Sequence, residues 1–153
     1  MSAAVAIDLD GALGDTRLLW NDWLSSAADL IGVEARALPA DRGAAAAELD
    51  RLGGGNWRVL LERFAEERAA VHFRRDAQTS AALRTLAAAG REIGVFTDAP
   101  ESLARVALAQ LGAGRHLVAV EAGSGALERL LERLGSDAVI VRSRVELLGQ
   151  SAA

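Results

Sequence analysis

The chain of 153 residues contains no cysteine, no lysine and no tyrosine, and its aromatic residues are three tryptophans and three phenylalanines. Without cysteine it forms no disulfide framework and no thiolate metal site. No apolar stretch approaches the ~20 residues that span a bilayer, so we expect no membrane partner. No basic segment followed by an apolar one stands at its start, so we expect a cytoplasmic protein without a secretory signal.

The charge balance is mildly acidic, with a formal net charge of −4, and all seventeen basic side chains are arginine. This balance gives no reason to expect nucleic acid as a partner. Because lysine is absent, any role that needs a side-chain ammonium group is either missing or filled by a guanidinium group, whose planar fork is no point charge. The chain is also rich in alanine, which is typical of a GC-rich coding sequence, so a single arginine carries little weight by itself.

Short apolar segments alternate with amphipathic ones over much of the chain, whose length suits one domain or a small core with an insertion. The alternation predicts an α/β fold, with a parallel sheet and helices on both faces. The expected strands are residues 3–7, 92–97, 116–120 and 138–141. The expected helices of this alternating part are residues 79–89, 100–111 and 126–134, followed by a short helical tail.

The long segment between the first two strands is predicted to be all-helical. One helix starts near Thr16, a second spans residues 40–52 with Pro39 suited to its first turn, and a third spans 57–70 after Asn56. The apolar residues expected to face inward from the third helix are Val59, Leu60, Phe64 and Ala65. The spacing of Trp20 and Trp23 favours core positions, although with Trp57 and Arg17 they are also candidates for lining a substrate pocket.

Two aspartates, Asp8 and Asp10, stand at the end of the first predicted strand and are followed by Gly11. Side chains at positions i and i+2 of a strand face the same way, and two like charges so close repel unless a cation lies between them or one is protonated. Open α/β folds bind their ligands at the carboxyl ends of the strands. The pair therefore indicates a functional site; the alternative is that both aspartates only cap the turn before the next helix.

The run Asp8-Leu9-Asp10-Gly11-Ala12-Leu13-Gly14-Asp15-Thr16 resembles the first motif of the haloacid dehalogenase (HAD) superfamily, Asp-x-Asp-Gly-Thr/Val-Leu followed by Asp-Thr/Ser. Ala12 departs from the usual Thr or Val. The resemblance implies a Rossmann-like, HAD-like parallel sheet of about four strands, in the order 4-1-2-3 for strands numbered along the chain. Residues 1–14 and 76–153 would then form the core, and residues 15–75 a small all-helical cap.

The resemblance also implies the chemistry. Asp8 would attack phosphorus to form an aspartyl-phosphate, and Asp10 would protonate the leaving oxygen and later deprotonate the hydrolytic water. The presence of Asp10 favours phosphate chemistry over dehalogenation, since a halide leaving group needs no proton. Magnesium would be bound through Asp8, the backbone carbonyl of Asp10 and water, and the substrate would be a small phosphorylated metabolite.

The second HAD motif is an apolar strand that closes on Thr or Ser, and Thr97 matches it. The resemblance implies that Thr97, with Asp98 and Gly11, binds the phosphoryl group at a helix N-terminus. For Asp98 the alternative is favoured, because Asp98-x-x-Glu101 has the spacing of a capping box.

The third and fourth motifs depart from the family pattern. The stretch 120–126 lacks the usual lysine, and Arg115, Arg142 and Arg144 are the nearest substitutes by topology; Arg142 or Arg144 would replace the positive charge beside the aspartates. The fourth motif normally supplies aspartates to magnesium, but here Ser143 or an arginine stands at that position, so the metal would be held weakly.

Two functions stay open. The first is a HAD-like phosphomonoester phosphatase with rewired cation and metal positions. The second is a catalytically impaired HAD-like module that binds a phosphorylated ligand or a protein partner. The sequence names neither the substrate nor the oligomeric state.

Overall fold

A four-stranded parallel sheet forms the centre of the computed structural model, which describes residues 3–52 and 55–153. The strands are β1 (Val5–Asp8), β2 (Ile93–Thr97), β3 (Ala119–Ala122) and β4 (Val139–Val141). Their order across the sheet is β3-β2-β1-β4, which confirms the predicted α/β class and the order 4-1-2-3. β3 starts later than the sequence suggested, because residues 114–116 form a short 3-10 helix instead.

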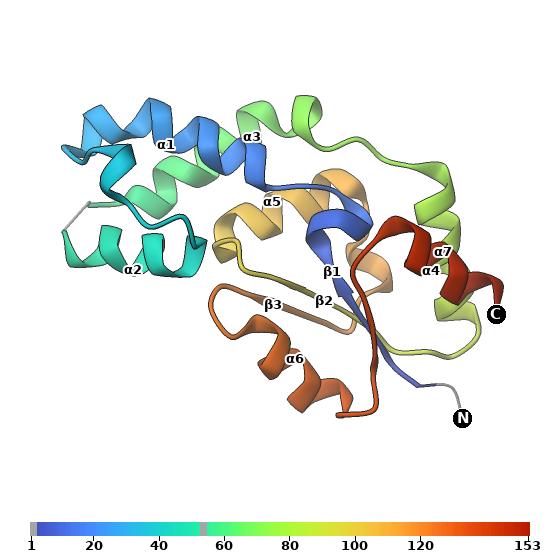
Figure 1. Ribbon diagram of the computed structural model, residues 1–153. Helices are drawn as coiled ribbons and strands as arrows, with labels where there is room; N and C mark the ends of the chain where they lie inside the picture. The colour runs from blue at the N-terminus through green and yellow to red at the C-terminus, as the bar shows by residue number, and fades with distance from the viewer. Residues whose placement is uncertain (1–2, 53–54) are drawn as a thin grey trace.

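Seven α-helices surround the sheet in the part of the chain that the structure describes. They are α1 (Arg17–Ile31), α2 (Arg42–Arg51), α3 (Trp57–His72), α4 (Ala77–Ala88), α5 (Glu101–Leu111), α6 (Ala126–Leu134) and α7 (Arg144–Ala152), with short 3-10 helices at Ala35–Ala37 and Gly114–His116. Figure 1 shows α1, α2 and α3 gathered at one end of the molecule and α4, α7 and the C-terminus at the other. α3 connects its end of the molecule to the sheet, because it packs on α5, whose side chains contact the sheet. The division into core and cap at residues 15 and 75 stays a prediction.

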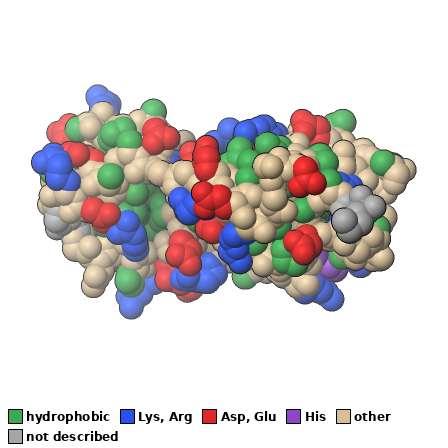
Figure 2. Space-filling view, turned by 90° about the horizontal axis from the view of Figure 1, so that it is seen from below, with side chains coloured by type: hydrophobic (Ala, Val, Ile, Leu, Met, Phe, Trp, Pro, Cys, Tyr) green, Lys and Arg blue, Asp and Glu red, His purple; other side chains and the backbone are tan. Residues whose placement is uncertain are grey.

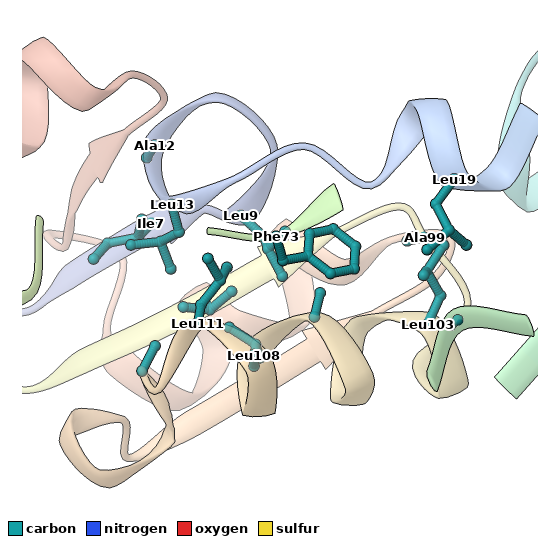
Figure 3. Packing of buried hydrophobic residues seen from close by; sticks show 14 of the residues in the cluster. Ile7, Leu9, Ala12, Leu13, Leu19, Phe73, Ala99, Leu103, Leu108 and Leu111 are labelled. Carbon is teal, nitrogen blue, oxygen red and sulfur yellow. The ribbon is translucent and has the colours of Figure 1, made fainter. Parts of the chain in front are cut away.

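The sheet is covered on both faces by apolar side chains of the helices. On one face, Leu130 of α6 packs with Ala6 and Phe96. On the other face, residues of α4, α5 and α7 form the larger cluster with β1 and β2. Figure 3 shows part of this cluster, where Leu108 and Leu111 of α5 point toward the turn that follows β1. Burial of each large apolar side chain stabilises the folded protein by about 1.5–3 kcal/mol. This packing holds the carboxyl end of β1 in place.

The three tryptophans form a separate group within this core. Trp20, Trp23 and Trp57 are at most 2% exposed, and their ring centroids lie 5.3 to 6.3 Å apart. Arg17, by contrast, is exposed and pairs with Asp15 at 2.8 Å. The tryptophans are therefore core residues that hold α1 to α3, and they do not line a pocket with Arg17.

Two predicted helix starts were wrong by about two residues, and in both cases an aspartate is the cause. Asp41 accepts a hydrogen bond from the backbone N–H of Ala44, so α2 begins after Asp41 and Pro39 lies outside it. Asp76 accepts from the backbone N–H of Thr79, so α4 begins before the predicted Thr79. Aspartate side chains satisfy N–H groups that the first helical turn leaves free.

The predicted inward face of α3 was also wrong in part. Val59 and Leu60 are 45% and 36% exposed. The buried positions are instead Trp57, Leu61, Ala65 and Ala69, which recur every four residues. Trp57 fixes this register because its ring packs against the two tryptophans of α1.

Replacing Trp23 should therefore destabilise the protein far more than replacing an exposed residue of the same region. We expect Trp23→Ala to lower the free energy of unfolding by about 3–5 kcal/mol, because it leaves a cavity between α1 and α3. Val59→Ala is the control and should change it by less than about 0.5 kcal/mol. Urea denaturation followed by circular dichroism measures both, and similar losses in the two variants would contradict this packing.

Candidate active site

The two aspartates lie at the carboxyl end of β1, as the sequence predicted. Asp8 is the last residue of the strand, and Asp10 lies in the tight turn Leu9–Leu13 that follows. Gly11 makes this turn feasible. Its φ of +107° is one that L side chains rarely adopt, and a Cβ there would lie 2.7 Å from the backbone oxygen of Arg142. The glycine therefore allows β1 and the segment after β4 to approach closely.

Asp10 is surrounded by hydrogen-bond donors. Its Oδ1 accepts from the backbone N–H and from the hydroxyl of Thr16, both at 2.7 Å. Its Oδ2 accepts from the hydroxyl of Thr97 at 2.8 Å and from the guanidinium of Arg42 at 2.7 Å. Burial by itself would raise the pKa of Asp10, but the hydrogen bonds from Thr16 and the charge of Arg42 outweigh it and hold the pKa below its usual value. Asp10 is therefore an ionised carboxylate whose four acceptor positions are all used.

Asp8 has the opposite electrostatic character. Its Oδ1 accepts the backbone N–H of Asp10 at 3.1 Å, and its Oδ2 lies 3.4 Å from the guanidinium of Arg142. Burial and the neighbouring charge of Asp10 raise the pKa of Asp8, and the hydrogen bond from the backbone N–H of Asp10 and the charge of Arg142 offset this only in part. The two carboxylates thus have pKa values shifted in opposite directions, which is a common feature of catalytic acid pairs.

Arg42 is the site residue that the sequence analysis missed. Its guanidinium belongs to the first turn of α2, is only 5% exposed, and contacts three residues of the site. It bonds to Asp10, to Oδ1 of Asp98 at 2.5 Å and to the hydroxyl of Thr16 at 2.5 Å. One signal was present in the sequence. A cation is unfavourable in the first turn of a helix, so an arginine there indicates a partner outside the helix.

Asp98 does not form the predicted capping box. α5 begins after Pro100 without a side-chain cap, and the carboxylate of Asp98 pairs with Arg42 instead. Charge attraction to a buried guanidinium outweighs a cap that gains a single hydrogen bond. Thr97, the preceding residue, is buried, and its hydroxyl donates to Asp10. Binding of phosphate by Thr97, Asp98 and Gly11 stays a prediction.

The three candidate cations from the sequence lie in different places. Arg142 follows β4 directly and lies beside Asp8. Arg144 pairs with Asp76 at 3.1 Å and also bonds to Gln78, both at α4, so it does not contact the aspartates. Arg115 precedes β3 and therefore lies at the amino end of the parallel strands, whereas Asp8 lies at their carboxyl end. Of these three, only Arg142 meets the pair.

A cavity of about 450 Å³ opens beside Asp8. Its lining includes Thr97, Asp98, Arg142 and the loop and first helical residues 123–126. A second cavity of about 360 Å³, lined in part by Arg42, shares Asp98 with the first. A larger cavity of about 620 Å³ lies between α5 and β3 and includes none of the predicted site residues. The cavity beside Asp8 is therefore the candidate substrate pocket, because the predicted site residues line it, although it is not the largest.

Magnesium does not fit the donors that the structure brings together. Within residues 3–52 and 55–153, no three acidic or histidine side chains are grouped in a way that holds a metal ion. Mg²⁺ binds through oxygen atoms, whereas here the guanidinium of Arg142 faces the carboxylate of Asp8, the side-chain ligand that the resemblance gives the metal. Ser143 caps α7 through the backbone N–H of Glu146 and supplies no carboxylate.

Comparison with known proteins identifies the fold. No protein-family model and no curated protein sequence matches the chain. Among solved structures, CbbY from Rhodobacter sphaeroides matches with a TM-score of 0.67 and 18% identity, over 92% of this chain and 77% of that one. A HAD-superfamily hydrolase of subfamily IA from Geobacter sulfurreducens matches with a TM-score of 0.59 and 20% identity, over 100% of this chain and 86% of that one.

A HAD phosphatase from Thermococcus onnurineus also matches, with a TM-score of 0.57 and 18% identity, over 92% of this chain and 77% of that one. At these identities the likeness concerns the fold. The chain therefore has the HAD-like fold that its first motif resembles, and the resemblance in the first strand extends to the whole architecture. What the site does within this fold depends on the residues described above.

The charge of Asp10 should stabilise the folded protein. Asp10→Asn breaks a buried ion pair and should cost about 3 kcal/mol at pH 7. A carboxylate whose pKa is lowered on folding stabilises the protein above its unfolded pKa of about 3.9, and this contribution disappears as the pH falls through the lower folded value. The stability gap between wild type and Asp10→Asn should therefore shrink below about pH 4, as urea denaturation across pH will show. A gap that stays constant with pH would contradict the charge pairing.

Asp8 provides the matched comparison, since the pKa shift has the opposite sign. A carboxylate whose pKa is raised on folding favours the folded state when protonated, and this contribution is lost as the pH rises through the raised value. Asp8→Asn removes that loss, so this variant should be as stable as wild type or more stable at pH 7. The same denaturation series measures it. A large loss of stability at pH 7 would show that Asp8 is instead held mainly by its pairing with Arg142.

Proposed function

We propose that this protein is a HAD-type phosphomonoester hydrolase that acts on a small phosphorylated metabolite through an aspartyl-phosphate on Asp8. One observation carries the proposal. Asp8 borders a cavity of about 450 Å³ that is also lined by Arg142 and by the first residues of α6, together with the acidic residues Asp41, Asp98 and Glu128. A nucleophile thus shares a cavity with a cation and with the N-terminus of a helix, both of which favour a phosphoryl group.

The reaction would proceed in two displacements. An oxygen of Asp8 forms a bond to phosphorus while the ester P–O bond breaks and the leaving oxygen takes a proton. Water then attacks the phosphorus of the aspartyl-phosphate, which releases inorganic phosphate and restores the Asp8 carboxylate. By the family resemblance, Asp10 would supply the first proton and accept the second.

Asp10 must change its contacts to take this role. All four of its acceptor positions are used by Thr16, Thr97 and Arg42, and its lowered pKa keeps it ionised. Thr97 is the partner that can give up its hydrogen bond to Asp10, because it lies at the end of β2 and also lines the cavity beside Asp8. If its hydroxyl donates to a bound phosphoryl oxygen, one oxygen of Asp10 is released and can take up a proton from solvent, which Asp10 then passes to the leaving oxygen.

Two solved structures with this fold contain small phosphorylated ligands or phosphate, which supports a small substrate for this protein. CbbY was crystallised in complex with phosphate, and a D10N mutant of CbbY, with a TM-score of 0.64 and 14% identity, in complex with xylulose-(1,5)bisphosphate. None of the helices in the described residues is long and apolar enough to cross a membrane. Figure 2 shows acidic and basic side chains interspersed over one face. The two CbbY complexes support a phosphorylated metabolite as the partner.

Hydrolysis of p-nitrophenyl phosphate tests the proposal. We expect slow turnover by the purified protein, because the lysine and the aspartates that usually stabilise the transition state are missing, and each such loss typically lowers a rate by about 10²–10³. Asp8→Asn should reduce the rate to background. Equal rates for wild type and Asp8→Asn would rule out Asp8 as the nucleophile.

A second candidate function is the binding of a phosphorylated ligand without catalysis. It is favoured because all acceptor positions of Asp10 are already occupied by hydrogen bonds. A protein that binds a phosphorylated ligand without hydrolysing it needs no free general acid, and here Asp10 and Thr97 satisfy each other. This candidate predicts that a sugar phosphate raises the melting temperature while no phosphate is released. Turnover that depends on Asp8 would exclude it.

A further inference from the structure

The position of Arg142 follows from the backbone pairing of the sheet. β1 and β4 run parallel with Ile7 opposite Val141, so the next residue of each strand brings Asp8 and Arg142 together. The backbone N–H of Arg142 donates to Glu146, and its backbone oxygen lies close to Gly11. The fold therefore places the backbone of Arg142 beside Asp8.

The guanidinium of Arg142 is held loosely above this fixed backbone. It lies 3.4 Å from Asp8, with its central carbon 5.4 Å from the ring centroid of Phe96. Its side chain is 57% exposed, and it lines the cavity beside Asp8. The group can therefore turn from Asp8 to a ligand in the cavity without giving up a buried contact.

Arg42 provides the second positive charge, and it comes from a different part of the chain. It is almost fully buried and forms ion pairs with both Asp10 and Asp98. Each carboxylate of the pair thus has its own guanidinium, so a divalent cation at Asp8 would be attracted by one carboxylate and repelled by the adjacent Arg142. Two of the three positive charges that the resemblance assigns to magnesium and lysine are thus present on these two side chains.

From this arrangement we infer that the site binds a phosphoryl group without a divalent cation, with the guanidinium of Arg142 contacting the phosphoryl oxygens beside Asp8. The inference rests on the proposed function, which names the phosphoryl group as the ligand. A guanidinium offers a planar fork of N–H donors that matches two phosphate oxygens. When Arg142 turns to the ligand, Oδ2 of Asp8 loses its ion-pair partner and faces the phosphorus.

Binding of inorganic phosphate, measured by isothermal titration calorimetry, tests the inference independently of turnover. We expect the same affinity in excess EDTA and in excess magnesium. Arg142→Gln should weaken binding about 10-fold or more, because it removes a charge-assisted contact. Arg144→Gln is the matched control: it removes the same charge two residues away, where the guanidinium pairs with Asp76, and should leave the affinity unchanged.

Several outcomes would overturn the inference. They are phosphate binding that requires magnesium, equal affinities for Arg142→Gln and Arg144→Gln, and the absence of phosphate binding in both EDTA and magnesium. Tight binding of Mn²⁺ by the wild-type protein without phosphate, seen by electron paramagnetic resonance, would also overturn it, since Arg142 would then leave room for a metal.

The inference and the proposed function fail in different ways. Hydrolysis of p-nitrophenyl phosphate that depends on both Asp8 and magnesium keeps the phosphatase and overturns the inference. Phosphate binding in EDTA that depends on Arg142, without any hydrolysis, supports the inference and leaves a phosphate-binding protein in place of an enzyme.

Discussion

The ion pair between Arg42 and Asp10 is the interaction on which the rest of the site depends. Both side chains are nearly excluded from solvent, which is costly for two charges unless their remaining donors and acceptors are satisfied. Thr16, Thr97 and Asp98 satisfy them. Because Arg42 comes from α2 and Asp10 from the turn after β1, the same contact also ties α2 to the carboxyl end of β1.

This ion pair gives the two aspartates different chemical properties. Asp10 is ionised and fully hydrogen-bonded, whereas Asp8 has a raised pKa and pairs with the partly exposed Arg142. Asp8 is thus the carboxylate available to a ligand, and Asp10 is the one that organises its surroundings. A site in which arginines supply the positive charge keeps the geometry of the HAD-like fold while changing what balances its carboxylates.

Much of the fold follows from local patterns in the sequence. The parallel sheet and the bounds of α6 agree with prediction, because a short apolar run or a strict helical spacing identifies an element by itself. The errors arose where a distant partner decides. Asp98 pairs with Arg42 of α2 instead of capping α5, and the tryptophans of α1 set which face of α3 is buried, so that Val59 is exposed.

By itself the sequence determined that Asp8 and Asp10 stand together at the carboxyl end of a strand, with Gly11 to allow the turn. The family resemblance limited the positive charge beside them to Arg142 or Arg144, but only the tertiary structure decided for Arg142 and added Arg42. Arg42 lies 32 residues from Asp10, and Arg142 lies 134 residues from Asp8. Periodicity and motif spacing describe neighbours along the chain, whereas the pairing of β4 with β1 and the packing of the α-helices bring these charges together across it.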